Sequence, residues 1–220
     1  MATSKNQRLG IMAILVVTVV GTIGSFAVMV LSSQNQATES AAQQETLNAY
    51  QASSKAYQAK VDAQAAQLSA QYFATFSPQA SRVGAFDANA VKAIAIEDLV
   101  IGTGEDITGT TKFAAYYIGW NPKGKIFDQS IDMSKLKAPI PIADGLDNAS
   151  LISGWKEALK GMKIGGIREI TLPSDKAYGE KGSGDTIPPN TPLKFIVMAI
   201  PLPQQIPQPE VPASLYQGAQ

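Results

Sequence analysis

A predominantly apolar run without charges lies near the start of the chain. Residues 9–31 contain no charged side chain, and at a helical rise of about 1.5 Å per residue they span the roughly 30 Å hydrocarbon core of a bilayer. Lys5 and Arg8 precede the run, whereas the first charges after it are acidic. This pattern predicts a cytoplasmic tail (1–8) and a transmembrane signal-anchor (9–31), with the rest of the chain extracytoplasmic. A cleaved signal peptide is the alternative, although its apolar core is usually only about 7–15 residues long.

Residues 32–76 are dominated by Ala, Gln and Ser and lack Gly and Pro. Such residues are mostly adequate or good helix formers, so we predict a helical stalk that holds the following domain away from the membrane. A heptad seam can be drawn through Leu47, Tyr50, Ser54, Tyr57, Val61, Gln64, Leu68 and Gln71. Because several of these are polar, the pattern leaves open a single helical spacer, a weak coiled-coil dimer or a disordered tether. Ser77-Pro78 should end the helix and begin a connector, 77–92, with a short helical turn near 88–91.

Short alternating or apolar runs, separated by Gly, Pro and Asn, fill residues 93–201. They predict strands at 94–101, 112–119, 125–127, 139–142, 166–172 and 193–200, and one helix at 150–160 that ends at Gly161. The last strand is apolar on both faces, as expected at the centre of a sheet. Many strands around one helix define an α+β domain. The Pro-rich segment 202–220 should be an extended, polyproline-like tail that is either solvated or bound to a partner.

Composition narrows the function. The 18 basic and 18 acidic residues balance, which gives no reason to expect a nucleic-acid partner. The chain contains no Cys and no His, so thiol nucleophiles, Ser-His catalysis and Cys- or His-ligated metals are excluded. A reaction that needs no proton abstraction and no covalent intermediate remains possible.

Five short motifs occur in order along the predicted domain. They are K-G-K-I-F-D-Q-S at 123–130, G-W-K-E-A-L-K-G at 154–161, A-Y-G at 177–179, T-I-P-P-N at 186–190 and P-L-K-F-I-V at 192–197. This ordered set closely resembles the FKBP-type peptidyl-prolyl cis/trans isomerases. The resemblance implies a five- or six-stranded antiparallel sheet wrapped on one short helix, with the site between them, and it leaves the first ninety or so residues unexplained.

The implied reaction asks for a particular kind of site. Rotation about an X-Pro bond crosses a barrier of about 20 kcal/mol, because the amide loses its resonance. The twisted amide is less polar than the planar one, so a water-poor aromatic pocket with a few donors at its rim favours it. No cofactor or metal is required.

The resemblance assigns the parts of that pocket. Trp155 would lie under the proline ring, Asp128 would be a polar group in the pocket, and the Tyr178 hydroxyl would donate to a substrate carbonyl. The expected catalytic set is Tyr117, Phe127, Asp128, Trp155, Tyr178 and Phe195. The expected substrate-binding set is Ile140, Leu151, Ile152, whose backbone N–H would donate to the ligand, and Ile187, which would close the lip of a loop. Singly, most of these would be ordinary core or turn residues; their joint spacing is what favours a site.

Two departures from the family pattern concern substrate binding. Ile140 stands where a further pocket aromatic is usual, and the loop at 179–186 is Gly-rich and charged, without bulky apolar residues. Losing one aromatic wall should weaken binding by about 1 kcal/mol. We therefore expect genuine but modest activity.

These observations together predict a membrane-anchored bacterial isomerase that acts on X-Pro bonds of unfolded or flexible exported polypeptides and that binds macrolides. Slow X-Pro isomerisation can limit folding, so the expected role is assistance to folding outside the cytoplasm. The alternatives are a non-catalytic proline-binding or chaperone module, and a surface spacer whose head is only structural.

Overall fold

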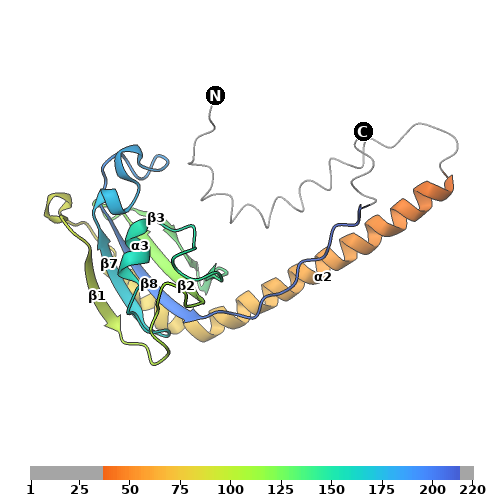
Figure 1. Ribbon diagram of the computed structural model, residues 1–220, viewed down its shortest axis with the longest axis horizontal. Coiled ribbons are helices and arrows are strands. Elements are labelled where there is room, and N and C mark those ends of the chain that lie inside the picture. The colour runs from red at the N-terminus through yellow and green to blue at the C-terminus, as the bar shows by residue number, and fades with distance from the viewer. Residues whose placement is uncertain (1–36, 214–220) are drawn as a thin grey trace. The chain divides into compact units, whose positions relative to one another are not determined.

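The computed structural model describes residues 37–213 (Figure 1). Their side chains are described from residue 43 onward. The chain divides into two compact units, Met1–Val61 with Ile206–Gln220, and Asp62–Gln205. The predicted transmembrane segment, 9–31, lies outside the described residues. Within residues 37–213, no helix is both long enough and apolar enough to span a membrane.

The stalk is helical. Helix α2 runs over Ala37–Phe76 and is followed by the 3-10 helix η2, Ser77–Arg82, which carries Pro78 in its first turn. The alternative of a disordered tether is therefore wrong for residues 37–76. The many Ala, Gln and Ser residues of this segment are compatible with a long helix. A second 3-10 helix, η3 at Ala88–Ala90, matches the predicted turn in the connector, and the Asp87 side chain caps it by accepting from the Asn89 N–H.

A six-stranded antiparallel sheet forms the body of the second unit. Its strands are β1 Ala95–Val100, β2 Phe113–Trp120, β3 Ile126–Gln129, β6 Ile140–Ile142, β7 Ile167–Leu172 and β8 Leu193–Pro201. The order is β1-β7-β8-β2-β3, with β6 paired to β2. A separate two-stranded ladder joins β4 Ile131–Asp132 to β5 Lys135–Leu136. The predicted central position of residues 193–200 is confirmed, because β8 pairs with β2 on one side and β7 on the other.

The single α-helix predicted within residues 93–201 is shorter than expected. Helix α3 covers only Ser153–Ala158, so the prediction of 150–160 was too long. Ile152 has an extended backbone at the N-cap, and Leu151 and Ile152 pack against the hydrophobic core without being part of the helix. Gly161 adopts a positive φ of 75°, as expected of a residue that ends a helix.

The sheet is apolar on both faces. The inner cluster, built around Phe113, Trp155, Ile170, Leu172 and Phe195, lies between the sheet and α3. The outer cluster, built around Phe76, Tyr116, Trp120, Ile167 and Ile196, lies on the opposite face. Successive strand residues point to opposite faces, so β2 contributes alternately to the two clusters.

The end of α2 covers the outer face, which the sequence did not predict. Phe76 is fully buried, and its ring lies 6.2 Å from that of Tyr116; the Tyr72 ring lies at the same distance from Tyr116. The Ser69 hydroxyl accepts a 2.8 Å hydrogen bond from the Leu136 N–H. Residues at the end of the stalk are therefore part of the fold of the second unit.

An ion-pair cluster on β7 and β8 explains why β7 is buried on both faces. Glu169, only 6% exposed, accepts from Arg82 at 2.7 Å and from Lys194 at 2.8 Å, and Arg82 also pairs with Glu97. Burial alone would raise the pKa of the Glu169 carboxyl, but the hydrogen bonds and charges of Lys194 and Arg82 together lower it. The polar face of β7 is thus covered by its partners and not by water.

Candidate functional site

Four aromatic side chains converge on the inner face of the sheet. Trp155 comes from α3, Tyr117 from β2, Phe127 from β3 and Phe195 from β8. The Trp155 ring meets those of Tyr117 and Phe195 edge to face, with centroids 5.6 and 5.5 Å apart, and Phe127 meets Phe195 in the same way at 5.5 Å. Such T-shaped contacts suit the charge distribution of aromatic rings. Trp155 and Phe195 are 3% exposed, whereas Tyr117 and Phe127 are half-buried and lie nearer the surface.

Gly119 makes this arrangement possible, and sequence reasoning missed it. Gly119 is paired with Phe195 across β2 and β8. A Cβ at this position would lie 2.6 Å from the Phe127 ring and 2.8 Å from the Phe195 ring. Only glycine leaves room for both rings, so the aromatic cluster depends on a residue without a side chain.

The polar groups sit at the rim of the aromatic cluster. The Tyr117 hydroxyl donates a short hydrogen bond to the Asp128 carboxylate, and the other Asp128 oxygen accepts from the Gln129 N–H at 2.8 Å. Burial, followed by the bond to Asp128, raises the pKa of Tyr117; burial, followed by the Asp128 charge, raises the pKa of Tyr178. Both phenols therefore remain protonated donors throughout the neutral range. The Tyr117–Asp128 pair was not predicted, because nothing in the spacing of the two residues indicates a cross-strand bond.

The remaining expected residues surround the same cluster. Ile187 is buried within it, and Ile140, Leu151, Ile152 and Tyr178 are half-buried against it. The structure thus brings nine of the ten predicted residues into the inner cluster, and the tenth, Asp128, is bonded to one of them. Among the described residues, the Ile152 N–H has no hydrogen-bond partner.

The indole N–H of Trp155 is also buried without a partner among the described residues. A buried unpaired donor costs about 1–3 kcal/mol, so native proteins hold few of them. Its position, next to Tyr117 and Phe195, places this unpaired donor inside the candidate site.

Asn121 ties the loop after Tyr178 to the rest of the domain. Its Oδ1 accepts from the N–H groups of Lys123 and Lys125 at 3.0 and 3.1 Å, which fixes the direction of the amide. Its Nδ2 then donates to the Thr186 carbonyl at 3.0 Å, directly before Ile187. Within residues 37–213 this is the one hydrogen bond that joins 179–190 to another element. The sequence shows Asn121-Pro122 only as a turn, so this role was missed.

Comparison with known proteins agrees with this geometry. The sequence model of a family described as FKBP-type peptidyl-prolyl cis-trans isomerase matches residues 104–200. An FK506-binding protein of Neisseria meningitidis serogroup A is 38% identical over 105 residues, which are 48% of this chain and 92% of that protein. A probable FKBP-type 25 kDa peptidyl-prolyl cis-trans isomerase of Pseudomonas aeruginosa is 34% identical over 102 residues, 46% of this chain and 40% of that protein.

A solved peptidyl-prolyl cis-trans isomerase structure from Pseudomonas syringae is 34% identical and covers 64% of this chain and 94% of its own, with a TM-score of 0.43. The relatives and the family match show that the chain belongs to the FKBP-type peptidyl-prolyl cis-trans isomerases. The predicted enzyme class is thereby confirmed, and members of this family bind proline-containing peptides and macrolides.

Proposed function

We propose that the aromatic cluster around Trp155 is the isomerase site and that it binds the proline ring of X-Pro segments. The observation that carries the proposal is the convergence of the predicted residues on one region of the inner face. They come from four strands, from α3 and the two residues before it, and from Tyr178 and the loop that follows it. Edge-to-face rings offer an apolar surface for a proline ring, and few polar atoms compete with it.

The polar groups suggest how such a site lowers the rotation barrier. The Tyr178 hydroxyl and the free Ile152 N–H would hold the carbonyls that flank the proline, while the peptide bond between them turns in water-poor surroundings. Asp128 holds the Tyr117 ring edge in place through its hydrogen bond. Because the twisted amide is less polar than the planar one, desolvation favours it over the ground state. Nothing in this scheme requires proton transfer.

Substitutions at the rim test the assignment. In the full chain purified in detergent, Asp128→Ala and Tyr178→Phe should each lower kcat/KM for a short X-Pro peptide about five- to tenfold, since a net hydrogen bond is worth about 1 kcal/mol. Thermal unfolding should change little. Tyr116→Phe is the matched control, because its hydroxyl is buried without a partner on the opposite face. Wild-type rates in both rim variants, or no inhibition by an FKBP-directed macrolide, would refute the site.

We further propose that residues 9–31 anchor the enzyme in the membrane of a bacterium, with the N-terminus cytoplasmic and the isomerase unit extracytoplasmic. The uncharged run and the basic residues before it support this topology. In that setting the enzyme would act on exported polypeptides whose folding waits for X-Pro isomerisation.

The topology is checked by fractionation. The chain should stay with membranes after alkaline carbonate extraction, and protease added to intact spheroplasts should digest the isomerase unit. Deleting residues 9–31 should leave the enzyme in the soluble fraction of the cytoplasm. A mature N-terminus beyond residue 31 in intact-mass analysis would instead establish the cleaved signal peptide.

A further inference from the structure

The Pro-rich tail shows a burial pattern with a period of three. Pro203, Ile206, Pro209 and Pro212 are half-buried, whereas the residues between them are exposed. A polyproline II helix has about three residues per turn, so this period marks one face of such a helix as covered. Residues 203–212 are therefore partly covered along one side.

Helix α2 shows a matching stripe. The seam positions from Leu47 to Leu68 are half-buried or buried, and most other positions of the helix in this range are exposed. Tyr50 is the most buried of these positions: it is only 7% exposed, although most of its neighbours along the helix are exposed. These are the positions that a coiled-coil partner would be expected to cover.

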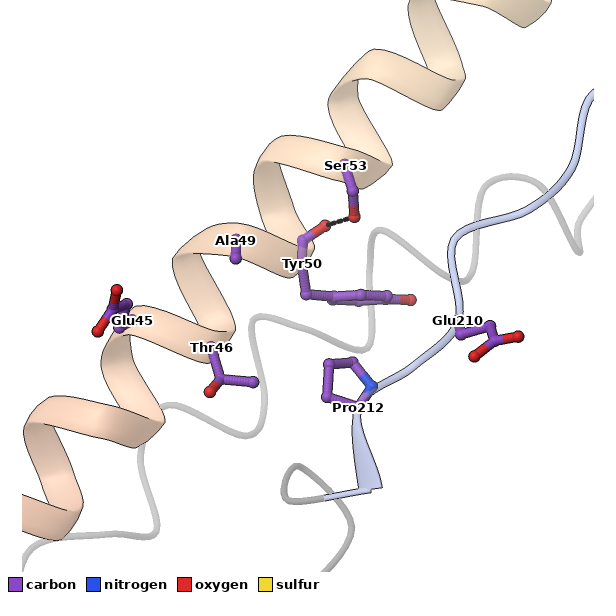
Figure 2. Close-up of a pocket in the computed structure, with 7 residues that line it drawn as sticks. All are labelled: Glu45, Thr46, Ala49, Tyr50, Ser53, Glu210 and Pro212. Carbon is purple, nitrogen blue, oxygen red and sulfur yellow. Dashed lines mark hydrogen bonds between the residues drawn. The ribbon is translucent and has the colours of Figure 1, made fainter.

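In the first unit the tail lies against this stripe. Tyr50, Thr46 and Ser53 of α2 line one pocket together with Glu210 and Pro212 of the tail (Figure 2). Figure 2 shows the Tyr50 ring directed at the tail, with the Pro212 ring beside it. A proline ring against an aromatic side chain buries apolar area at little entropic cost, because the polyproline conformation is already restricted.

In the second unit a polar seam residue makes the corresponding contact. Gln64 Nε2 donates a 2.8 Å hydrogen bond to the Gln204 carbonyl. A polyproline helix has no internal hydrogen bonds, so its carbonyls are free to accept. Gln64, which weakens a coiled-coil seam, is suited to this different partner.

We propose that the α2 seam is a binding site for the chain's own tail, residues 203–212, and that the stalk is a monomeric pair of an α-helix and a polyproline helix. The tail takes the place that a second helix would need, so the coiled-coil dimer does not form. The same contact keeps the tail prolines bound to the stalk.

Crosslinking in the full chain tests this directly, because the natural sequence contains no Cys. One variant carries Thr46→Cys with Pro212→Cys, and a second, which keeps every proline, carries Gln64→Cys with Gln204→Cys. The matched controls move the helix thiol two positions, to the exposed opposite face, as Asn48→Cys with Pro212→Cys and Ala66→Cys with Gln204→Cys. All four are treated in detergent with a short bismaleimide and followed by intact mass.

A free tail on a flexible tether would give seam and control pairs similar effective concentrations of about millimolar. A docked tail instead holds the seam thiols together, so both seam pairs should crosslink within one chain at least about tenfold faster than their controls. Equal rates in seam and control pairs would show a free tail. Crosslinked species of twice the mass through the seam thiols would show a helix dimer. Either result would overturn the proposal.

Discussion

Replacing Trp155 with alanine should remove almost all isomerase activity and lower the free energy of unfolding by about 3–5 kcal/mol. The side chain is 3% exposed and makes edge-to-face contacts with Tyr117 and Phe195. Its loss therefore opens a cavity in the core, and it also removes the surface proposed to lie under the proline ring of the substrate. Denaturant unfolding and peptide isomerisation rates would measure the two effects on the same samples.

Ile196→Ala separates these effects. Ile196 follows Phe195 on β8 but is buried in the outer cluster. Its truncation should cost about 2–5 kcal/mol of stability while kcat/KM per folded molecule stays close to the wild-type value. If Ile196→Ala abolished activity as completely as Trp155→Ala in fully folded samples, the inner face would have no special part in the reaction.

Phe76→Ala should destabilise the isomerase unit by about 3–5 kcal/mol, although the residue belongs to the stalk helix. Phe76 is fully buried against Tyr116 on the outer face, so the alanine leaves a cavity between α2 and the sheet. The loss of stability would be measured by denaturant unfolding, monitored by the fluorescence of the two Trp residues. One of them lies in the inner cluster and the other in the outer cluster.

The neighbouring Thr75→Ala is the control, because Thr75 is exposed and its truncation should change stability by less than about 0.5 kcal/mol. Activity of folded Phe76→Ala should persist, since the inner face is untouched. Equal stability of the two variants would mean that the stalk is an independent spacer, as the sequence pattern alone suggested.

Much of the fold could be predicted because its signals are local. The alternation in 166–172, the two-sided apolar run in 193–200 and the Pro78 stop each correspond to an element near the predicted bounds. The candidate site was assigned from ordered motifs, and nine of its ten residues belong to or pack against one cluster.

The features that were missed depend on contacts distant in sequence. Tyr72 and Phe76 lie in the same continuous helix as the rest of the stalk, and their spacing alone does not show that they pack on a sheet. The burial of Glu169 requires Arg82 and Lys194 to arrive from other elements. Likewise, in the sequence Gln64 is only a polar residue that weakens the predicted coiled-coil seam. Its hydrogen bond to Gln204, 140 residues away, can be seen only in the structure. The membrane segment 9–31 remains a prediction from sequence.

Strand β2 serves two purposes at alternate positions. Ala115 and Tyr117 face the inner cluster that holds the proposed isomerase site, while Tyr116 and Ile118 face the outer cluster that includes the end of the stalk helix. Selection therefore acts differently on the two sets of positions in this strand. The odd positions are constrained by isomerase activity, and the even positions by packing against the stalk. In a lineage that lost the stalk, the even positions would be free to drift toward polar residues, while the odd ones would keep their identity as long as the enzyme worked.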